Sequence, residues 1–590
     1  MPVAIAIFME LANITSIYKN KGSKLDLNND RGIFSVTQVR SIIDKLIYND
    51  FYEIIDDNLS DSNVGGRKNR NIRDNLFIVY GVINNAVQNN LEVDLSLYDV
   101  AKCFDAQWHA ETMNDMWNVG VNNDKFALMS EINKRCNIAI KTPAGLTDRF
   151  TLEEIEMQGT VAGPIKATVQ IDTLGRDCYE RREGLFTYND CVSIPPLSMC
   201  DDIASFALCG VDSVVTNAIV NAMIESKKLE FGHTKCYNIH IGNSENLCSD
   251  LKVHGNIMRK KCSETYLGDI ICNNGRNDLN IEKRRNNGIG AVSSIMSTLK
   301  QVMMGHFHFE VGLVMRDTML ISKMIYSSEI WYNVTKQQYS KLEEIDEMLM
   351  RKLLDLPSSA PRISLYNECW KTQIKYLIKV RRLMYYWHVL HLDSSELVYK
   401  FYSAQKLKPV KNDFVIQIEQ DKSDLGLKNL SDDDIKKISR EKFRSCILSK
   451  IDQLKCKKYQ ESKGTKTIDL QVRSSSTPAN YLLSKNLCVK EIQTLFKLKT
   501  QMINVKHNFK SSNTNNMWCR TCFLFSETQE HLSVCSEIRK HLPHIDFKRF
   551  NYKMLRGSLS EQEKFTKVYQ LILETRNDLL KDVTPPSTTD

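Results

Sequence analysis

Two adjacent acids, Asp201 and Asp202, lie between two short apolar runs at 193–199 and 203–208. This pattern predicts a β-hairpin with the acids at its tip. Two like charges about 4 Å apart repel by roughly 4 kcal/mol at an effective dielectric constant near 20, so the pair is costly without a cation beside it. A divalent metal ion would turn the repulsion into attraction, and Mg²⁺ usually takes one or two carboxylates together with substrate phosphates. A solvated acidic turn is the common alternative.

A third acid, Asp99, stands at the end of a predicted strand. Val93, Leu95 and Leu97 alternate with polar residues, which is typical of a β-strand. Taken alone, Asp99 would be a turn residue or a helix N-cap. Together with Asp201 and Asp202 it completes a set of three carboxylates able to hold two metal ions.

A basic, glycine-containing loop at 63–70 precedes a predicted helix. Gly65 and Gly66 allow the backbone to approach a ligand closely, and Arg67, Lys68 and Arg70 supply charge suited to phosphate. The apolar periodicity that follows places the loop at a helix N-terminus, where anions are favoured. A solvated basic loop remains the simpler interpretation.

Near the end of the chain, the spacing Cys519-x2-Cys522-x8-His531-x3-Cys535 predicts a metal site. These four side chains can surround one Zn²⁺ tetrahedrally, and four protein ligands leave no position for a reactive water, so the site would be structural. Cysteines without metal are the alternative. Because the segment has few apolar residues, we expect this small module to need its metal to fold.

Composition places limits on the class of protein. The chain has 590 residues, enough for roughly three to five domains. Its net charge of +8 permits a polyanionic partner. No apolar run reaches the ~18 residues of a membrane span, and the first residues make a poor signal peptide. Seventeen scattered cysteines favour a reducing compartment, so we expect an intracellular protein.

Helical periodicity marks several further elements. Val39, Ile42, Ile43, Leu46 and Ile47 share one face of a predicted helix, and 339–356 form another amphipathic helix. Basic residues recur at helical spacing within 371–392, namely Lys371, Lys375, Lys379 and Arg382. They predict a basic stripe, which is either a solvated face or a surface that tracks a duplex backbone.

The order of these motifs resembles the palm of reverse transcriptases and, more narrowly, the non-LTR (LINE-type) retrotransposon family. In chain order they are Asp99 with Phe104 and Asp105, Gln158-Gly159 with Pro164, Asp201-Asp202, Lys235, and Tyr266-Leu267-Gly268. The earlier segments Asn28-Asn29-Asp30-Arg31-Gly32-Ile33 and 63–74 resemble two further boxes of that family. The resemblance covers roughly residues 13–400.

This resemblance implies an α+β right-hand polymerase, with fingers at 1–92, a palm that forms the reverse transcriptase domain at 93–284, and a helical thumb at 285–400. We expect a helical and linker region at 401–512 and the CCHC zinc module at 513–550. The family's activity is RNA-directed DNA polymerisation, with an RNA template, a DNA primer and deoxynucleoside triphosphates as partners and no membrane.

The resemblance also assigns roles to residues. Asp99, Asp201 and Asp202 would hold two Mg²⁺ ions, which Mn²⁺ can replace. The remaining roles are proton donation to pyrophosphate by Lys235, clamping of the triphosphate by Arg67 and Arg70, a steric gate against ribonucleotides at Phe104, and a template groove at Gln158 and Gly159.

The chain departs from the family pattern at several positions. Met199-Cys200 replaces Tyr-Ala before the paired acids, and Gly66 replaces a phenylalanine. Pro195 and Pro196 require the incoming strand to be an edge strand or to begin late. The chain starts where the fingers start, so we expect a truncated copy of an element without its endonuclease, and target nicking would need a separate endonuclease.

Three hypotheses follow. Because the catalytic acids are all present, a working polymerase is the first. The second is a catalytically inactive, decayed or co-opted protein that binds RNA or RNA–DNA hybrid, and the third is a poorly packed remnant. Reverse transcription primed at chromosomal DNA favours the nucleus over the cytoplasm, although no compact Lys/Arg-rich signal is evident.

Overall fold

The computed structural model describes residues 11–20, 22–134, 136–151, 160–243, 250–301, 309–461, 477–508 and 517–582. The chain divides into two compact units. The first unit comprises Met1–Asn277, Ile330–Asn333 and Tyr386–Gln420, and the second comprises Asp278–Glu329, Val334–Tyr385 and Asp421–Asp590. Among the described helices, none has the length and apolarity needed to cross a bilayer.

A five-stranded sheet forms the centre of the first unit, in the order β14-β11-β3-β10-β9. Its strands are β3 (Val93–Asp99), β9 (Leu197–Met199), β10 (Asp202–Leu208), β11 (Tyr237–Ile241) and β14 (Arg259–Lys260). Strand β3 lies between two antiparallel neighbours, β10 and β11, and its residues are buried on both faces up to Asp99. The strand predicted from alternation is therefore a central strand.

The predicted hairpin at the acidic pair is confirmed. Strands β9 and β10 are antiparallel, and Met199 pairs with Asp202 across a two-residue turn of Cys200 and Asp201. Cys200 adopts a left-handed backbone with φ of 54°. Strand β9 begins at Leu197, directly after the two prolines, and lies at the edge of the sheet. The strand is therefore both an edge strand and one that begins late, the two arrangements that the prolines allow.

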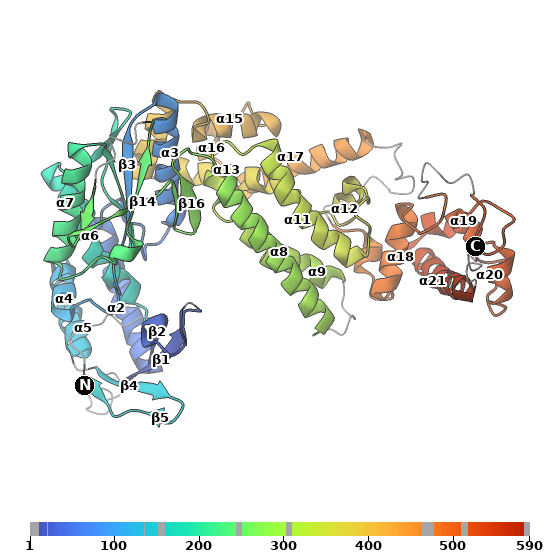
Figure 1. Ribbon diagram of the computed structural model, residues 1–590, viewed down its shortest axis with the longest axis horizontal. Coiled ribbons are helices and arrows are strands. Elements are labelled where there is room, and N and C mark those ends of the chain that lie inside the picture. Colours follow the sequence, from blue (N-terminus) through green and yellow to red (C-terminus); the bar gives the residue numbers. More distant parts are fainter. Residues whose placement is uncertain are drawn as a thin grey trace, which may run out of the picture. The chain divides into compact units, whose positions relative to one another are not determined.

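Helices cover both faces of this sheet (Figure 1). Helices α6 (Gly163–Arg181) and α7 (Val211–Ser226) pack on one face, and α3 (Ile72–Asn89) packs on the other. Every residue of α3 from Asp74 to Ala86 is buried. Phe77 of this helix contacts the rings of Phe401 and Phe414 edge-on. A helix buried all round is the core of a unit rather than its surface.

A second sheet has the order β2-β1-β4-β5, with β6 also paired to β4. Its strands are β1 (Leu11–Tyr18), β2 (Asp30–Val36), β4 (Asn137–Thr142), β5 (Gly145–Leu146) and β6 (Phe150–Thr151). Short antiparallel hairpins complete the strands of the unit: β7 (Phe186–Tyr188) with β8 (Val192–Ile194), β12 (Lys252–Val253) with β13 (Asn256–Ile257), and β15 (Ser263–Tyr266) with β16 (Asp269–Cys272).

The helix predicted around 39–47 is present as α2 (Gln38–Asn58), and of the five apolar residues on its predicted face only Ile47 is buried. Val39, Ile42 and Leu46 are exposed. The buried row instead continues from Ile47 through Phe51 and Ile55 at four-residue spacing and packs with residues of α4, α5 and α6. The larger side chains beyond the short window decide which face is buried. The other helices wholly in this unit are α4 (His109–Asn118), α5 (Asp124–Lys134) and α14 (Leu397–Leu407).

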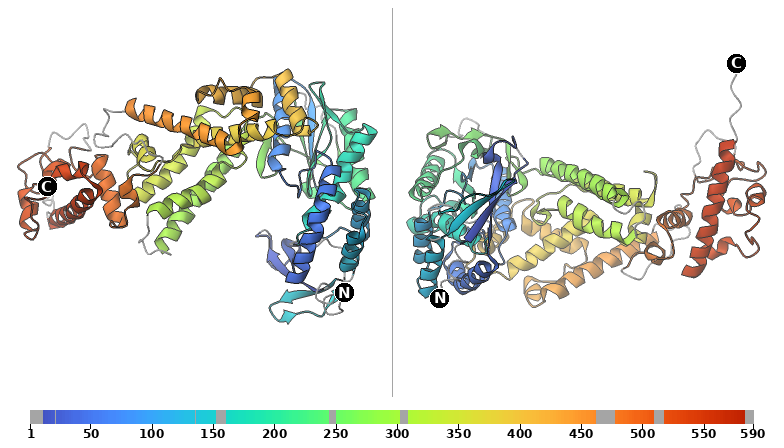
Figure 2. Two further views of the ribbon diagram at one scale, coloured as in Figure 1. Left: turned by 180° about the vertical axis from the view of Figure 1, so that it is seen from behind. Right: turned by 90° about the horizontal axis from the view of Figure 1, so that it is seen from below.

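The second unit is helical in its described residues. Helices α8 (Asp278–Gln301) and α11 (Lys336–Leu354) pack side by side (Figures 1 and 2), and α11 matches the helix predicted at 339–356. The remaining helices of the unit are α9 (Phe309–Met315), α10 (Ser322–Met324), α12 (Arg362–Glu368), α16 (Asp432–Lys436), α17 (Arg440–Glu461), α18 (Val489–Lys499), α19 (Gln529–Leu532), α20 (Ser536–Lys540) and α21 (Leu559–Asp582), with a π-helical turn at Arg316–Ile321. Helices α13 (Ile374–Leu390) and α15 (Phe414–Asp424) each contain a boundary between the units.

The predicted basic stripe on α13 is not a free basic surface. Lys379 donates hydrogen bonds to Asp421 and Asp424, and the buried Arg382 donates to the other oxygen of Asp421. Lys371 precedes the helix and pairs with Asp317. These charges are neutralised inside the second unit, so the interpretation of the stripe as a surface that tracks a duplex is wrong for these residues.

A buried ion pair stabilises the second unit. The Nε and an amino group of Arg316 donate to the two carboxylate oxygens of Asp346, each at 2.6 Å, and both side chains are almost fully buried. The same guanidinium also donates to Asp317, whose side chain is half exposed. One arginine therefore has a buried and an exposed carboxylate partner.

We expect the Asp346→Asn variant to lose roughly 3–5 kcal/mol of unfolding free energy, because it leaves the Arg316 charge buried without its counterion. Asp317→Asn is the matched control and should cost about 1 kcal/mol or less, since its carboxylate is half exposed. Urea denaturation followed by circular dichroism measures both. Equal shifts in the two variants would contradict this assignment.

Candidate functional site

Strand pairing in the first unit brings three carboxylates together. Asp99 is the last residue of β3 and Asp202 is the first residue of β10, and the two face each other across the antiparallel ladder. Asp201 lies in the turn beside them, and its carbonyl oxygen accepts a hydrogen bond of 3.1 Å from the amide of Val100. The register of the sheet therefore fixes all three acids at the same end of two neighbouring strands.

Lys235 joins this cluster from a third segment. Its ammonium nitrogen lies 2.7 Å and 3.1 Å from the two carboxylate oxygens of Asp99. Lys235 ends a short helical turn just before β11, and the amide of Gly232 in that turn donates to the carbonyl of Asp99. The Lys235 side chain is 60% exposed, so this end of the sheet is open to solvent.

The three acids carry more negative charge than their surroundings neutralise. Burial, together with the neighbouring Asp201 and Asp99, raises the pKa of Asp202 to about 6. Burial also raises the pKa of Asp201, while Lys235 and Arg31 act in the opposite direction. A site made only of carboxylate oxygens, with two acids resisting ionisation, fits hard divalent cations such as Mg²⁺ or Mn²⁺.

A loop at 59–67 holds the tip of the hairpin in place. The amide of Val64 donates to the carbonyl of Ser198 at 3.1 Å, and the amide of Ser198 donates to the carbonyl of Ser62 at 3.0 Å. A Cβ atom on Gly65 would lie 2.9 Å from the backbone nitrogen of Cys200, so only glycine fits there without a shift of the turn. The loop thus packs directly against the residue that precedes Asp201.

The two arginines predicted to clamp a triphosphate, Arg67 and Arg70, form ion pairs and hydrogen bonds with neighbouring protein groups in this structure. The buried Arg67 donates to a carboxylate oxygen of Asp56 at 2.6 Å and to the carbonyls of Asp56, Ser60 and Asn63. Arg70 pairs with Asp61 and Glu396. In this structure both guanidinium groups are engaged in structural ion pairs, so the geometry argues against the clamp and Arg67 and Arg70 stay predictions in that role.

The remaining predicted residues lie as follows. Phe104 is half-buried in the turn after β3, and Gln158 and Gly159 lie outside the described residues. Arg31 was not singled out by sequence analysis, although its motif was. It belongs to β2, and its charge makes a minor contribution that lowers the pKa of Asp201. The sequence signal that could have identified Arg31 was its position within the Asn28–Ile33 motif.

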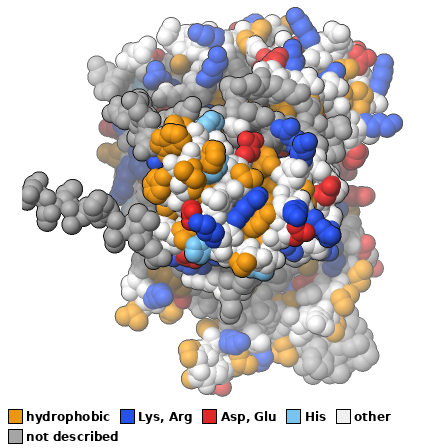
Figure 3. Space-filling model, turned by 90° about the vertical axis from the view of Figure 1, so that its right-hand side faces the viewer, with side chains coloured by type: hydrophobic (Ala, Val, Ile, Leu, Met, Phe, Trp, Pro, Cys, Tyr) orange, Lys and Arg blue, Asp and Glu red, His pale blue; other side chains and the backbone are white. Residues whose placement is uncertain are grey.

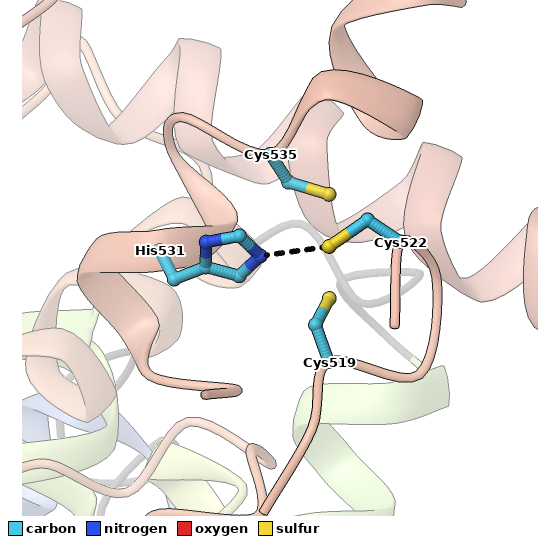
Figure 4. Close-up of side chains that lie close together, drawn as sticks. All are labelled: Cys519, Cys522, His531 and Cys535. Atoms are coloured by element: carbon cyan, nitrogen blue, oxygen red, sulfur yellow. Dashed lines mark hydrogen bonds between the residues drawn. The ribbon is translucent and has the colours of Figure 1, made fainter. Parts of the chain in front are cut away.

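The four predicted zinc ligands also come together (Figure 4). One ligand atom from each of Cys519, Cys522, His531 and Cys535 lies within 4.8 Å of the others. The Sγ of Cys522 is 3.3 Å from the Nε2 of His531, and a hydrogen bond shared with Cys535 lowers the pKa of the Cys519 thiol. Three sulfurs and one imidazole nitrogen around one point fit a tetrahedral Zn²⁺.

This cluster is packed against the rest of the second unit, so the expectation of little apolar material nearby is wrong. Leu532 and Ile538 are buried, as are Phe565 and Tyr569 of α21. The buried Glu527 accepts hydrogen bonds from Arg520 and from Arg576 of α21, with the Arg576 contact at 3.0 Å. Tertiary contacts with α21 therefore support the segment in addition to any metal.

Exposed aromatic side chains surround the same cluster. Trp518, Phe523 and Phe525 are each more than half exposed. Figure 3 shows hydrophobic and basic side chains gathered on the face formed by the C-terminal part of the chain. Exposed apolar groups of this kind mark interaction surfaces in soluble proteins.

Comparisons with known proteins give a coarse likeness. No protein-family model and no curated protein matches the chain. Three telomerase structures from Candida species are similar to it. The Candida tropicalis telomerase in complex with a TWJ fragment of telomeric RNA has 11% identity and a TM-score of 0.36 over 78% of this chain and 63% of that chain.

The other two telomerase structures have similar sequence identities and TM-scores. The Candida albicans complex with the TWJ fragment has 10% identity and a TM-score of 0.33 over 61% of this chain and 64% of that chain. The apo Candida tropicalis telomerase truncated from its C-terminal domain has 12% identity and a TM-score of 0.32, with 45% of this chain and 54% of that chain covered. The chain thus spans between half and two thirds of the length of these telomerases.

The raised pKa of Asp202 predicts how this site affects stability. Between its ordinary value near 3.8 and about 6 the folded chain keeps a proton that the unfolded chain has lost, so this group makes the metal-free protein less stable as pH rises through that window. At pH 7 without divalent ions, Asp202→Asn should therefore melt higher than the wild type, by roughly 2–4 °C.

Thermal melts with and without Mg²⁺ provide the measurement. Mg²⁺ should raise the melting temperature of the wild type and of Asp212→Asn, an exposed acid of α7, but not that of Asp202→Asn. A wild type that does not respond to Mg²⁺, or an Asp202→Asn protein that melts lower, would show that these acids do not form a cation site.

Proposed function

We propose that the protein is an RNA-directed DNA polymerase that adds deoxynucleotides to a primer 3′-hydroxyl on an RNA template. The observation that carries this proposal is the meeting of Asp99, Asp201 and Asp202 at one end of β3 and β10, with the ammonium of Lys235 2.7 Å from Asp99. The order of motifs along the chain supports the finer assignment to the non-LTR retrotransposon type of reverse transcriptase.

Asp99, Asp201 and Asp202 are the residues that would hold two Mg²⁺ ions. Bound there, divalent ions lower the pKa of the attacking hydroxyl and neutralise charge on the triphosphate. Burial, together with the repulsion from Asp201 and Asp99, raises the pKa of Asp202, and a divalent cation beside these acids would relieve both effects. Both effects cost stability in the metal-free chain.

Two basic residues are candidates for contacts with the triphosphate or with the departing pyrophosphate. Lys235 is exposed and carries transferable protons at the edge of the carboxylates, which suits proton donation to departing pyrophosphate. Arg31 is the better candidate than Arg67 or Arg70 for a contact with the triphosphate, because its charge acts on Asp201 while the other two are engaged in ion pairs.

The C-terminal cluster would contribute to nucleic-acid binding. Cys519, Cys522, His531 and Cys535 would hold one structural Zn²⁺, and the exposed rings of Trp518, Phe523 and Phe525 offer surfaces on which unpaired bases can stack. For a non-LTR retrotransposon protein, the template would be RNA and the primer DNA. The protein would act in the nucleus, and a separate endonuclease would supply the nick.

Primer extension tests the proposal directly. Purified protein with an oligo(dT) primer on poly(rA), in the presence of Mg²⁺ or Mn²⁺, should incorporate deoxythymidine. The Asp201→Asn variant should lose activity by roughly two orders of magnitude or more, because it removes a metal ligand from the reacting centre. Asp212→Asn, which changes an exposed acid of α7, should retain full activity.

The failure of this experiment is also informative. A folded protein that binds RNA–DNA hybrid but extends no primer in either form would reject the polymerase and favour the non-enzymatic binder. Hybrid binding should survive in Asp201→Asn in both cases, since the nucleic-acid backbone is held by other groups.

Removal of the C-terminal zinc gives an independent prediction. Cys522→Ser should lower the bound zinc by one equivalent per chain and weaken binding to hybrid, because the ring-bearing segment loses its fixed shape. Contacts of Glu527 with Arg576 should keep α21 helical, so we expect local loosening, seen as faster tryptic cleavage after Arg520. Cys446→Ser on α17 is the control and should change neither zinc nor cleavage. Unchanged zinc in Cys522→Ser would contradict the site.

A further inference from the structure

A second group of metal-binding side chains lies in the first unit, at the other end of the central sheet. Asp94 is near the start of β3, Cys209 directly follows β10, and His240 is on β11. One ligand atom from each lies within 4.8 Å of the other two. Asp94 and Asp99 are five residue steps apart along strand β3, which corresponds to ~16 Å at about 3.3 Å per residue, so this group is distinct from the carboxylate site.

The geometry of this group matches the first shell of a tetrahedral metal ion. The Nδ1 of His240 is 3.3 Å from the Sγ of Cys209 and 3.2 Å from the Oδ1 of Asp94. Ligand pairs around a tetrahedral Zn²⁺ are separated by roughly 3.3–3.6 Å, given metal–ligand bonds of about 2.0–2.3 Å. The three side chains therefore need almost no movement to surround one ion.

The other nitrogen of His240 lies beside a carboxylate, although the two groups are not aligned for a hydrogen bond in this structure. Its Nε2 lies 3.0 Å from a carboxylate oxygen of Glu92. Metal-bound histidines usually donate their second ring N–H to a carboxylate, which fixes the tautomer and strengthens the ligand. If Nε2 carries the proton, the lone pair of Nδ1 is available to a metal ion held together with Cys209 and Asp94.

Hydrogen bonds alone do not give every polar atom of Asp94, Cys209 and His240 a partner. A single Nδ1 either donates to Asp94 or accepts from Cys209, and it cannot do both. The Oδ2 of Asp94 is buried and has no hydrogen-bond partner, and Asp94 is only 1% exposed. Buried carboxylate oxygens are normally paired or bound to a metal, so this unpartnered oxygen is a second observation that indicates a cation.

We propose that Asp94, Cys209 and His240 bind one Zn²⁺ ion, with Glu92 as the outer carboxylate. Thiolate and imidazole ligands favour zinc over Mg²⁺, so the Mg²⁺ of a polymerase reaction would not fill this site. The ion joins β3, β11 and the residue after β10 at the end of the sheet away from Asp99. Three protein ligands leave a fourth position for a water molecule.

Zinc content measured on the full chain tests the proposal. In a Cys519→Ser/Cys522→Ser background, which disables the C-terminal cluster, the protein should retain one zinc per chain. Co²⁺ in place of zinc should give a sulfur-to-cobalt charge-transfer band. Cys209→Ser should remove the band and the bound metal, His240→Gln should remove the metal, and Cys262→Ser, an exposed cysteine of the same unit, should preserve both.

If Cys209→Ser or His240→Gln fails to fold, as judged by circular dichroism, zinc binding by the Glu92→Gln variant tests the proposal instead. Glu92 contacts the ring nitrogen and not the metal, so its loss should weaken zinc binding about 10–100-fold while the protein stays folded. A folded background protein without zinc would overturn the proposal and leave His240 as a polar contact between Asp94 and Glu92. Zinc that Cys209→Ser, His240→Gln and Glu92→Gln all leave unchanged would overturn it equally.

Discussion

The convergence of Asp99, Asp201 and Asp202 at one partly buried end of two strands is the constraint on which this part of the first unit depends. The antiparallel register of β3 and β10 places Asp202 opposite Asp99, and any slip by one residue would turn these side chains to the other face. Several features of the surrounding chain prevent such a slip. The edge strand β9 starts only after the two prolines, its Ser198 exchanges backbone hydrogen bonds with the loop at 62–64, and Gly65 fits against the turn where a larger residue would not. Much of the local structure therefore serves to hold these three acids together at one end of β3 and β10.

Several other buried charges are instead paired with a counterion. Arg316 is paired with Asp346, Arg382 with Asp421, Arg67 with Asp56, and Glu527 with two arginines. Each of these groups has its counterion within hydrogen-bond distance, so burial does not leave an isolated charge. The contrast separates the paired charges from the three acids at the end of β3 and β10. Removing one partner of a buried pair leaves an uncompensated charge, whereas acids whose pKa values are raised by burial and by one another are candidates for cation binding.

Local patterns predicted the local features of this structure. The hairpin at 199–202, the strand ending at Asp99, helices α3 and α11, and the convergence of the C-terminal cysteines and histidine all follow from spacing within a short segment. Tertiary pairing explains what was missed. Nothing near Lys379 or Arg382 in the sequence reveals that Asp421 neutralises both, and nothing near Arg67 identifies Asp56 as its partner. The apolar face seen in the sequence at 39–47 is mostly not the buried face of α2, because the decisive side chains, Phe51 and Ile55, lie beyond the window that suggested the helix.

The same limit applies to Asp94, Cys209 and His240, which belong to three segments and show no motif spacing. Strand β3 nevertheless relates their position to that of the catalytic candidates. Its Asp99 end offers only carboxylate oxygens and an exposed lysine, a combination that suits hard ions exchanging with substrate phosphates. Its Asp94 end offers sulfur and nitrogen ligands around a largely buried carboxylate, a combination that suits an ion held permanently. A soft ion anchored at one end of a strand leaves the hard ligands at the other end free for chemistry, because the two donor sets do not compete for the same metal.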